Sequence, residues 1–393
     1  MMKDLAKRLG VEGYPDTLEE IYALVTEPDL SICDEVFLRE LNREFSLFGE
    51  FERDVLFGAR DLLGKPDELL WATLAVKYIA GCDCAAKANQ MTFPPLDGSP
   101  ARDTLMLLVL LRYLPRCAEL YRNRGFVDAE LNYQLKTVPE CLSIVNKIEG
   151  RPGITLVYYH WICLYIFCEI FNYGAFNYQI RRLELPHLVL KNKKSGEYAV
   201  LAIGGKYHRS GGVFGSLGLT DTDGAFEATF TETDECYEGY PTRDGVVVNE
   251  SAVFLKSEWE TVATPDSYVL SIHIPRGTRL DSDFVKAEFD FGYKLAKERF
   301  SDYQIDVIYC GTWLLSTALD AMLDGNSKIL GFSKLFERFP LLCPNNSFFT
   351  FVFGKYTDDI ASLPEDTSLQ RKIKNLYLDG GYMHPCAGIY KYK

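Results

Sequence analysis

The chain has 393 residues, of which 47% are hydrophobic and 25% are charged, and its formal net charge is −13. This length allows two or three compact domains, and the composition is that of an ordinary globular protein. An acidic chain without a basic stripe is a poor partner for nucleic acid or an anionic membrane, because phosphate neutralisation dominates such binding. We therefore expect its partners to be small molecules or proteins.

The N-terminus, Met-Met-Lys-Asp-Leu-Ala-Lys-Arg-Leu, lacks the apolar core and cleavage site of a signal peptide. The most apolar segment, residues 154–170, is shorter than the span of about 20 residues that crosses a bilayer. The eleven cysteines are scattered and form no Cys-x-x-Cys pair, so they do not show the spacing of a zinc site. We expect a cytoplasmic protein without a bound metal.

Residues 1–175 show helical periodicity almost throughout. Thr17-Leu-Glu-Glu20 matches a capping box, and Pro66 suits the first turn of a helix. Glu149-Gly-Arg-Pro-Gly153 predicts a helix end before a new start. Apolar residues recur at helical spacing in four further segments, which are 45–62, 104–114, 127–148 and 154–173.

The pattern changes after Phe176, where residues begin to alternate with the period of a half-buried strand. Strands joined by short polar turns are then followed by helices that alternate with strands, which is typical of an α+β sheet domain. The sequence predicts an all-helical N-terminal domain, residues 1–176, and an α+β domain, residues 177–393. The predicted strands are 178–190, 197–203, 226–231, 246–255, 269–274, 305–310 and 347–353, and the predicted helices are 282–300, 313–323 and 368–378.

One segment of the second domain points to chemistry. An apolar strand ends at Pro275, and a loop with Arg276, Gly277 and Arg279 leads to a helix that Asp281 or Ser282 can cap. The free N–H groups and the dipole of a helix N-terminus both favour negative charge. A basic turn before such a helix start therefore predicts an anion site.

The same residues carry a resemblance to a known family. Tyr268 to Pro275, the following Arg-Gly-Thr-Arg-Leu, and Asp306-Val-Ile-Tyr-Cys-Gly-Thr-Trp-Leu-Leu315 resemble a bacterial two-domain acyltransferase-like family. Its members pair a helical N-terminal domain with a C-terminal domain shaped like a GNAT N-acyltransferase. The resemblance implies a GNAT-like mixed sheet and transfer of an acyl group, from acetyl-CoA or another acyl-CoA, to a small or peptidic amine bound between the two domains.

The resemblance also assigns residues to the cofactor. In GNAT enzymes the pantetheine pairs with the edge of a central strand, and the loop and helix that follow hold the pyrophosphate. Carried over to this chain, the pattern implies that the acyl-CoA contacts Ile274, Arg276, Gly277, Thr278 and Arg279.

Acid–base chemistry on an amine and a thioester needs groups that exchange protons. His273 alternates with Ile272 and Ile274 and is predicted to point away from the core, so we name it as a catalytic candidate beside Cys310. Thr312 and Trp313, at the end of the next strand, are candidates for substrate contact. The alternatives are a hydrogen-bonded structural histidine, a buried thiol that no base activates, and a core tryptophan.

Two other functions stay open at this point. The chain could be a GNAT-shaped ligand-binding or scaffold protein without catalysis, since the loop has one glycine where the family pattern has two, and Pro275 removes a backbone donor. It could also be an interaction module whose helical domain binds a partner. The sequence does not indicate the oligomeric state.

Overall fold

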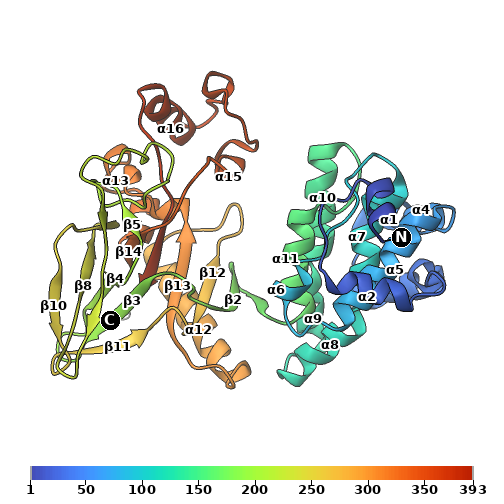
Figure 1. The fold of residues 1–393 in the computed structure, drawn as a ribbon, viewed down its shortest axis with the longest axis horizontal. Helices are drawn as coiled ribbons and strands as arrows, with labels where there is room; N and C mark the ends of the chain where they lie inside the picture. Colours follow the sequence, from blue (N-terminus) through green and yellow to red (C-terminus); the bar gives the residue numbers. More distant parts are fainter. Residues whose placement is uncertain (1, 392–393) are drawn as a thin grey trace. The chain divides into compact units, whose positions relative to one another are not determined.

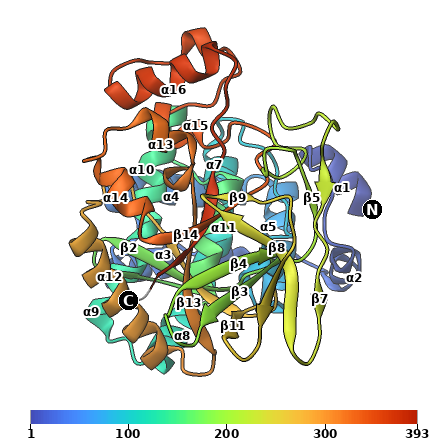
Figure 2. The same ribbon diagram turned by 90° about the vertical axis from the view of Figure 1, so that its left-hand side faces the viewer.

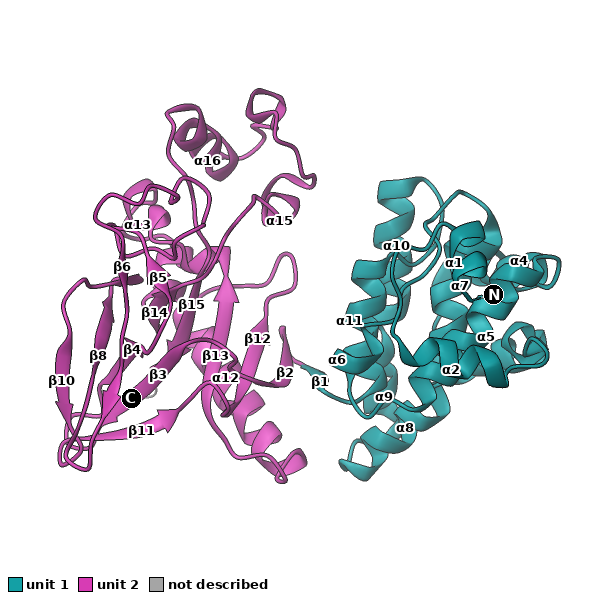
Figure 3. Cartoon of the chain, viewed as in Figure 1, with its two compact units in different colours: residues 1–172 teal, residues 173–393 magenta. Residues whose placement is uncertain are grey.

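The computed structural model describes residues 2–391. The chain divides into two compact units, residues 1–172 and 173–393 (Figure 3). Unit 1 is helical and unit 2 is built on sheets, so the predicted α+β class, with a helical region before a mixed-sheet domain, is confirmed. Among residues 2–391, no helix combines the length and the apolar character that a membrane crossing requires.

Unit 1 is a bundle of short helices joined by turns and loops (Figure 1). The predicted start at Pro66 is confirmed, and the predicted stop is confirmed at Gly150, which caps its helix in the left-handed conformation. The helices are α1 (Met2–Leu9), α2 (Thr17–Leu24), η1 (Leu30–Cys33), α3 (Glu35–Phe45), η2 (Gly49–Phe51), α4 (Glu52–Leu63), α5 (Pro66–Ala80), α6 (Ala85–Ala88), α7 (Pro100–Leu111), α8 (Leu114–Asn123), α9 (Asp128–Leu135), α10 (Thr137–Glu149) and α11 (Leu156–Ile166), and strand β1 (Ile170–Tyr173) follows.

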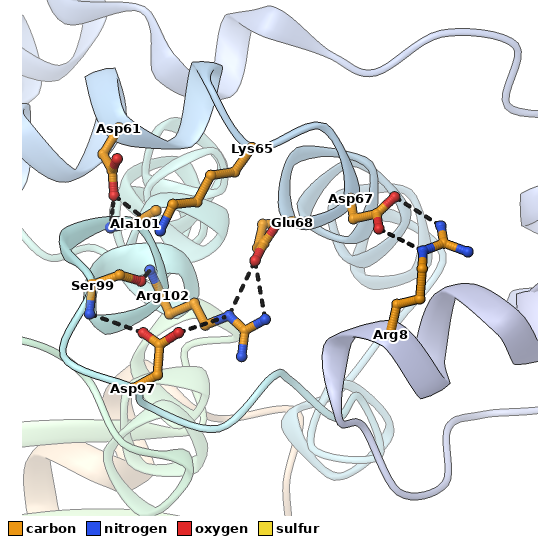
Figure 4. Close-up of polar contacts among 9 residues, drawn as sticks. All are labelled: Arg8, Asp61, Lys65, Asp67, Glu68, Asp97, Ser99, Ala101 and Arg102. Carbon is orange, nitrogen blue, oxygen red and sulfur yellow. Dashed lines mark hydrogen bonds and ion pairs between the residues drawn. The ribbon is translucent and has the colours of Figure 1, made fainter.

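Helix α7 is almost entirely buried, and polar groups hold its first turn in place (Figure 4). The Ala101 N–H donates to Asp61 Oδ2 at 3.1 Å, and the Arg102 N–H donates to Ser99 Oγ at 3.4 Å. The Arg102 side chain donates from Nε and from a terminal nitrogen to Glu68, each at 3.1 Å. The two side chains are only 16% and 13% exposed, so Glu68 relies on Arg102, while Arg102 is also compensated by Asp97, whose Oδ2 lies 3.4 Å from its Nε (Figure 4).

Unit 2 contains a central sheet and a second sheet (Figure 2). Its strands are β2 (Phe176–Arg182), β3 (His187–Asn192), β4 (Tyr198–Ala202), β5 (Lys206–Tyr207), β6 (Phe226–Glu227), β7 (Thr231–Glu232), β8 (Cys236–Arg243), β9 (Val246–Val247), β10 (Ala252–Leu255), β11 (Trp259–Ala263), β12 (Tyr268–His273), β13 (Ile305–Thr312), β14 (Phe336–Pro340) and β15 (Cys386–Tyr390). Its helices are α12 (Ser282–Arg299), η3 (Trp313–Leu315), α13 (Ala318–Met322), α14 (Lys328–Ser333), α15 (Phe349–Phe353), η4 (Ile360–Ser362) and α16 (Ser368–Leu378).

The central sheet of unit 2 has the strand order β2-β12-β13-β15-β14, and the second sheet has the order β10-β8-β4-β3-β11. One face of the central sheet packs against the second sheet, through a shared cluster that includes Val189, Val200, Val269 and Val307. Helix α12 covers the other face, where the Tyr178 hydroxyl donates to its backbone. Strands β12 and β13 therefore lie in the middle layer of three.

Several predicted elements are wrong in detail. Thr17 lies inside α2, and its N-cap Asp16 makes no side-chain cap bond, so the predicted capping box does not form. The predicted strand 178–190 is two strands, because Glu184 adopts a left-handed φ of 54° and Pro186 interrupts the pairing. The predicted helix 313–323 is the short turn η3 followed by α13, and the predicted helix 154–173 ends at Ile166 before β1.

The apolar run 347–353 was predicted as a strand and forms helix α15 instead. Phe349 and Phe353, four residues apart, are both buried in a cluster with α16, while Phe351 between them is 71% exposed. A spacing of four places side chains on one face of a helix. An apolar run of this length does not distinguish a buried strand from a helix by periodicity, which explains the error.

Candidate functional site

The neighbouring strands β12 and β13 run parallel and then separate. Their ladder pairs Leu270 with Ile308 and Ser271 with Tyr309, and it ends there, although β12 continues to His273 and β13 to Thr312. Beyond this point β12 pairs only with β2, and β13 pairs only with β15, within the described residues. The facing edges of the two strands therefore keep backbone groups that no neighbouring strand satisfies.

Cys310 lies where the separation begins. Its Sγ is 3.6 Å from the carbonyl oxygen of Ile272, to which the thiol donates across the gap. The residue is fully buried, and burial raises the pKa of its thiol to about 12. The side chain therefore stays protonated at neutral pH and lacks the thiolate that a nucleophile needs.

His273, the last residue of β12, is partly buried, and its Nε2 donates to Oε1 of Gln179 at 2.9 Å. The pKa of the imidazole is lowered to about 4, mainly because burial penalises the charged form and also because of the positive charge of Arg181. The ring is therefore neutral at pH 7. A neutral imidazole held in place by a hydrogen bond is able to accept a proton.

The structure places His273 and Cys310 on opposite faces of the central sheet. Ser271 and Tyr309 are paired in register, so their side chains share a face, and His273, two residues further on, shares it too. Cys310 follows Tyr309 directly and points to the other face, toward α12. The two catalytic candidates from the sequence are therefore close along the strands but do not converge on one reacting atom.

The face that carries His273 holds further polar groups that the sequence interpretation missed. Gln179 lies opposite Ser271 on β2, and the Tyr309 side chain, 7% exposed, lies beside Gly311, where an added Cβ would sit 2.7 Å from the Tyr309 hydroxyl. Burial raises the pKa of Tyr309 to about 12. The period-two alternation of these strands shows which residues of one strand share a face. It does not give the register between strands, which places Gln179 opposite Ser271 and Ser271 opposite Tyr309.

The loop after β12 forms a tight turn. Thr278 donates its N–H and its hydroxyl to the Pro275 carbonyl, at 3.2 and 2.7 Å, and the hydroxyl also reaches the Ala175 carbonyl at 3.2 Å. Gly277 has a φ of 83°, which a residue with a side chain rarely adopts, and no atom lies within 4 Å of the place where its Cβ would be. Arg276 is exposed and has no hydrogen bond or ion pair to any residue between 2 and 391.

Helix α12 begins immediately after this loop, and its start is left without side-chain caps. The carboxylate of Asp281, its N-cap, accepts from Arg279 at 2.6 Å and from Lys328 of α14 at 3.1 Å, and these two cations hold its pKa below the usual value. No acceptor in the described part of the chain bonds the N–H groups of residues 282–284. These donors and Arg276 form the kind of positive end that binds an anion.

The two substrate candidates of the sequence interpretation lie at the end of β13. The Thr312 hydroxyl accepts from the Leu314 N–H at 3.3 Å and so caps η3. Trp313 is partly buried and packs against the apolar cluster of α13, α15 and α16. Both residues have clear structural roles here, and neither is brought to the His273 face.

The arrangement of unit 2 has the defining features of a GNAT-like fold: a parallel strand pair that separates, a turn and a helix N-terminus after the first of the two strands, and antiparallel strands beside the second. Residues 170–390 match the family described as the GNAT-like C-terminal domain, and the chain belongs to this family. No curated protein matches the sequence.

Solved structures with the same fold cover both units. One is an acyltransferase in complex with decanoyl-CoA and teicoplanin, and another is a mutant acyltransferase in complex with octanoyl-CoA. Each matches with a TM-score of 0.63 and 15% sequence identity, over 100% of this chain and 99% of the other. At this identity the likeness shows a shared fold alone and does not by itself transfer an activity.

Proposed function

We propose that the protein is an acyl-CoA-dependent N-acyltransferase whose acceptor is a small or peptidic amine. The observation that carries the proposal is the separation of β12 and β13 after Ser271 and Tyr309, directly before an uncapped helix start. The solved structures of this fold with octanoyl-CoA and decanoyl-CoA support it.

The open edge of β12 suits a pantetheine arm. Its amides would pair with backbone groups of residues 272–274 other than the Ile272 carbonyl, which accepts from Cys310, as an added strand does. The pyrophosphate would bind the N–H groups at the start of α12, with Arg276 as the cation that has no partner in the described residues. Arg279 contributes less in this arrangement, because Asp281 already holds its guanidinium.

The chemistry needs two proton transfers. The acceptor nitrogen attacks the thioester carbon, the carbon–sulfur bond breaks, one proton leaves the nitrogen and one reaches the thiolate. His273, neutral at pH 7, takes up the proton of the amine, and Tyr309, protonated and on the same face, supplies a proton to the leaving sulfur. In this mechanism Cys310 has no covalent role. Its hydrogen bond to the Ile272 carbonyl helps to fix the positions of β12 and β13 where the two strands separate.

Thermal unfolding with acetyl-CoA, octanoyl-CoA and decanoyl-CoA tests the binding step, since a ligand of the folded state alone raises the melting temperature. We expect the shift to disappear in the double variant Arg276→Ala, Arg279→Ala and to persist in the control Arg182→Ala, which removes an exposed arginine of β2. If none of the three thioesters shifts the transition at millimolar concentration, the proposal fails.

Turnover separates the enzyme from a binding or scaffold protein of the same fold. His273→Gln keeps a polar side chain and should leave the acyl-CoA shift intact while it lowers the rate of thiol release with an amine acceptor by about 100-fold. An unchanged rate in this variant would remove His273 from the mechanism. Acyl-CoA binding without turnover of any amine would favour the scaffold.

A further inference from the structure

Unit 2 contains a cavity that takes no part in the site described above. It has a volume of about 620 Å³ and lies at β14, the last strand of the central sheet. Strands β15 and β13 separate β14 from β12, and at a spacing of about 4.8 Å per strand the cavity is on the order of 14 Å from the divergence. Cavities of this size hold small molecules.

Charged side chains of both signs line the cavity. Arg338 and Asp320 satisfy each other through two hydrogen bonds, of 3.2 and 2.7 Å. The other charged residues of the lining make no side-chain hydrogen bond or ion pair with any residue that the structure describes. These residues are Asp244, Lys334, Glu337 and Lys391.

The two acids in this set are close enough to interact. Glu337 is partly buried, and burial raises its pKa; the positive charge of Lys391 opposes this rise, and the negative charge of Asp244 adds to it by a smaller amount. Lys391 thus acts on Glu337 without reaching the 4 Å of an ion pair. Both acids line the same cavity, and an ammonium group placed beside them would interact favourably with each.

An organic cation suits these acids better than a metal ion does. No group of three or more His, Cys, Asp or Glu side chains within residues 2–391 is arranged to hold a metal ion. Lys334 and Lys391 also line the cavity, and their ammonium groups could bind an anionic group of the same ligand. Leu323, Leu330 and Phe336 add apolar surface to the same lining.

We propose that this cavity binds a zwitterion of short-peptide size, with its ammonium at Glu337 and Asp244 and its carboxylate at Lys334 and Lys391. The site is separate from the acyl-CoA site and does not depend on acyl transfer. It would let the protein bind a peptide or amino-acid-like molecule outside the reacting centre.

Calorimetric titration of the full chain with trialanine tests the proposal, with N-acetyl-trialanine and trialanine amide as probes that lack one charge each. We expect binding of trialanine at millimolar concentration and an affinity roughly 10-fold lower for either blocked peptide, since one charged hydrogen-bonded contact is lost. Glu337→Gln and the double variant Lys334→Ala, Lys391→Ala should lower the trialanine affinity by a similar factor.

Glu260→Gln, which removes an exposed acid of β11 far along the second sheet, is the matched control and should bind as the parent does. Circular dichroism verifies that each variant is folded. The proposal is overturned if trialanine does not bind, if the blocked peptides bind equally well, or if Glu337→Gln has the affinity of the control.

Discussion

The starts of α7 and α12 form an instructive pair. Both helices begin beside an arginine and a carboxylate. At α7, Asp61 and Ser99 accept from the first N–H groups, and the Arg102–Glu68 pair is largely shielded from solvent (Figure 4). At α12, the carboxylate of Asp281 turns away to Arg279 and Lys328, and the first N–H groups receive no acceptor from the described residues.

The difference separates a structural helix start from one that is able to bind a ligand. A helix N-terminus whose donors are all used by the protein stabilises the fold and has nothing left for an anion. A start whose donors stay exposed keeps that capacity at a cost in stability. The comparison therefore predicts that substitutions at α7 change the free energy of unfolding, whereas substitutions at α12 change ligand binding. A polar group that lacks a partner but is buried is a third case, and its effect should be on stability.

His187 shows that a missing partner alone does not mark a binding position. The residue is 2% exposed, neither ring nitrogen has a hydrogen-bond partner among the described residues, and the ring packs on Phe339 with centroids 4.6 Å apart. Burial lowers the pKa of the imidazole to about 3. Because the unfolded chain takes up a proton near pH 6.5 and the folded chain does not, stability falls as the pH drops below about 6.5 and continues to fall toward about 3.

Between pH 7 and pH 4.5 this effect of His187 amounts to about 2.5 kcal/mol of the free energy of unfolding. Urea unfolding at the two pH values should therefore show a smaller acid loss in His187→Leu than in the parent. His273, whose pKa is also lowered, keeps part of the slope in the variant. Identical pH slopes for the two proteins would contradict the enclosed, neutral state of His187.

At the closed helix start, Glu68→Ala should lower the free energy of unfolding by about 2 kcal/mol, because Arg102 would keep a poorly solvated charge with less compensation. Denaturant unfolding measures the loss. Arg8→Ala is the matched control, since its pair with Asp67 is exposed and exposed pairs contribute less than about 1 kcal/mol. Equal losses of stability in Glu68→Ala and Arg8→Ala would mean that the burial of an ion pair does not determine how much its removal costs.

At the loop before the open start, Gly277→Ala should cost about 1 kcal/mol, because its φ of 83° strains any residue with a Cβ although the space is empty. Gly325→Ala controls for the added methyl group, since Gly325 also has no neighbour within 4 Å and has no positive φ. Thermal or urea unfolding compares the two variants. If Gly325→Ala loses as much stability as Gly277→Ala, the positive φ of Gly277 is not the cause of the loss.

Asp281→Ala should tighten CoA binding by about threefold, because it frees Arg279 and Lys328 to interact with phosphate. The helix loses no side-chain cap bond in this variant, so its stability should change little. Asp283→Ala removes the same charge from the same turn, and the Asp283 side chain is fully exposed. Calorimetric titration with CoA should show a smaller gain in affinity for Asp283→Ala than for Asp281→Ala. An equal gain would mean that the change in net charge alone explains the tighter binding.

The local sequence identified the elements whose signals are short-range. Pro66 began a helix and Gly150 ended one, and residues 282–299 formed the amphipathic helix that follows the basic loop. The change from helical to alternating periodicity near Phe176 gave the order of the two parts. The strands β14 and β15 were missed, because each is only five residues long and neither shows a period-two alternation of apolar and polar residues.

What the sequence by itself determined was a helical half, a sheet half, and a basic glycine-containing turn between a strand and a helix. Only the tertiary structure decided that Arg279 is held by Asp281 while Arg276 has no partner in the described chain, and that Cys310 and His273 lie on opposite faces. The physical reason is that turns and helix starts depend on neighbours in the chain, whereas strand register and ion pairing depend on residues far apart in sequence. The separation of β12 from β13 is a property of such a register.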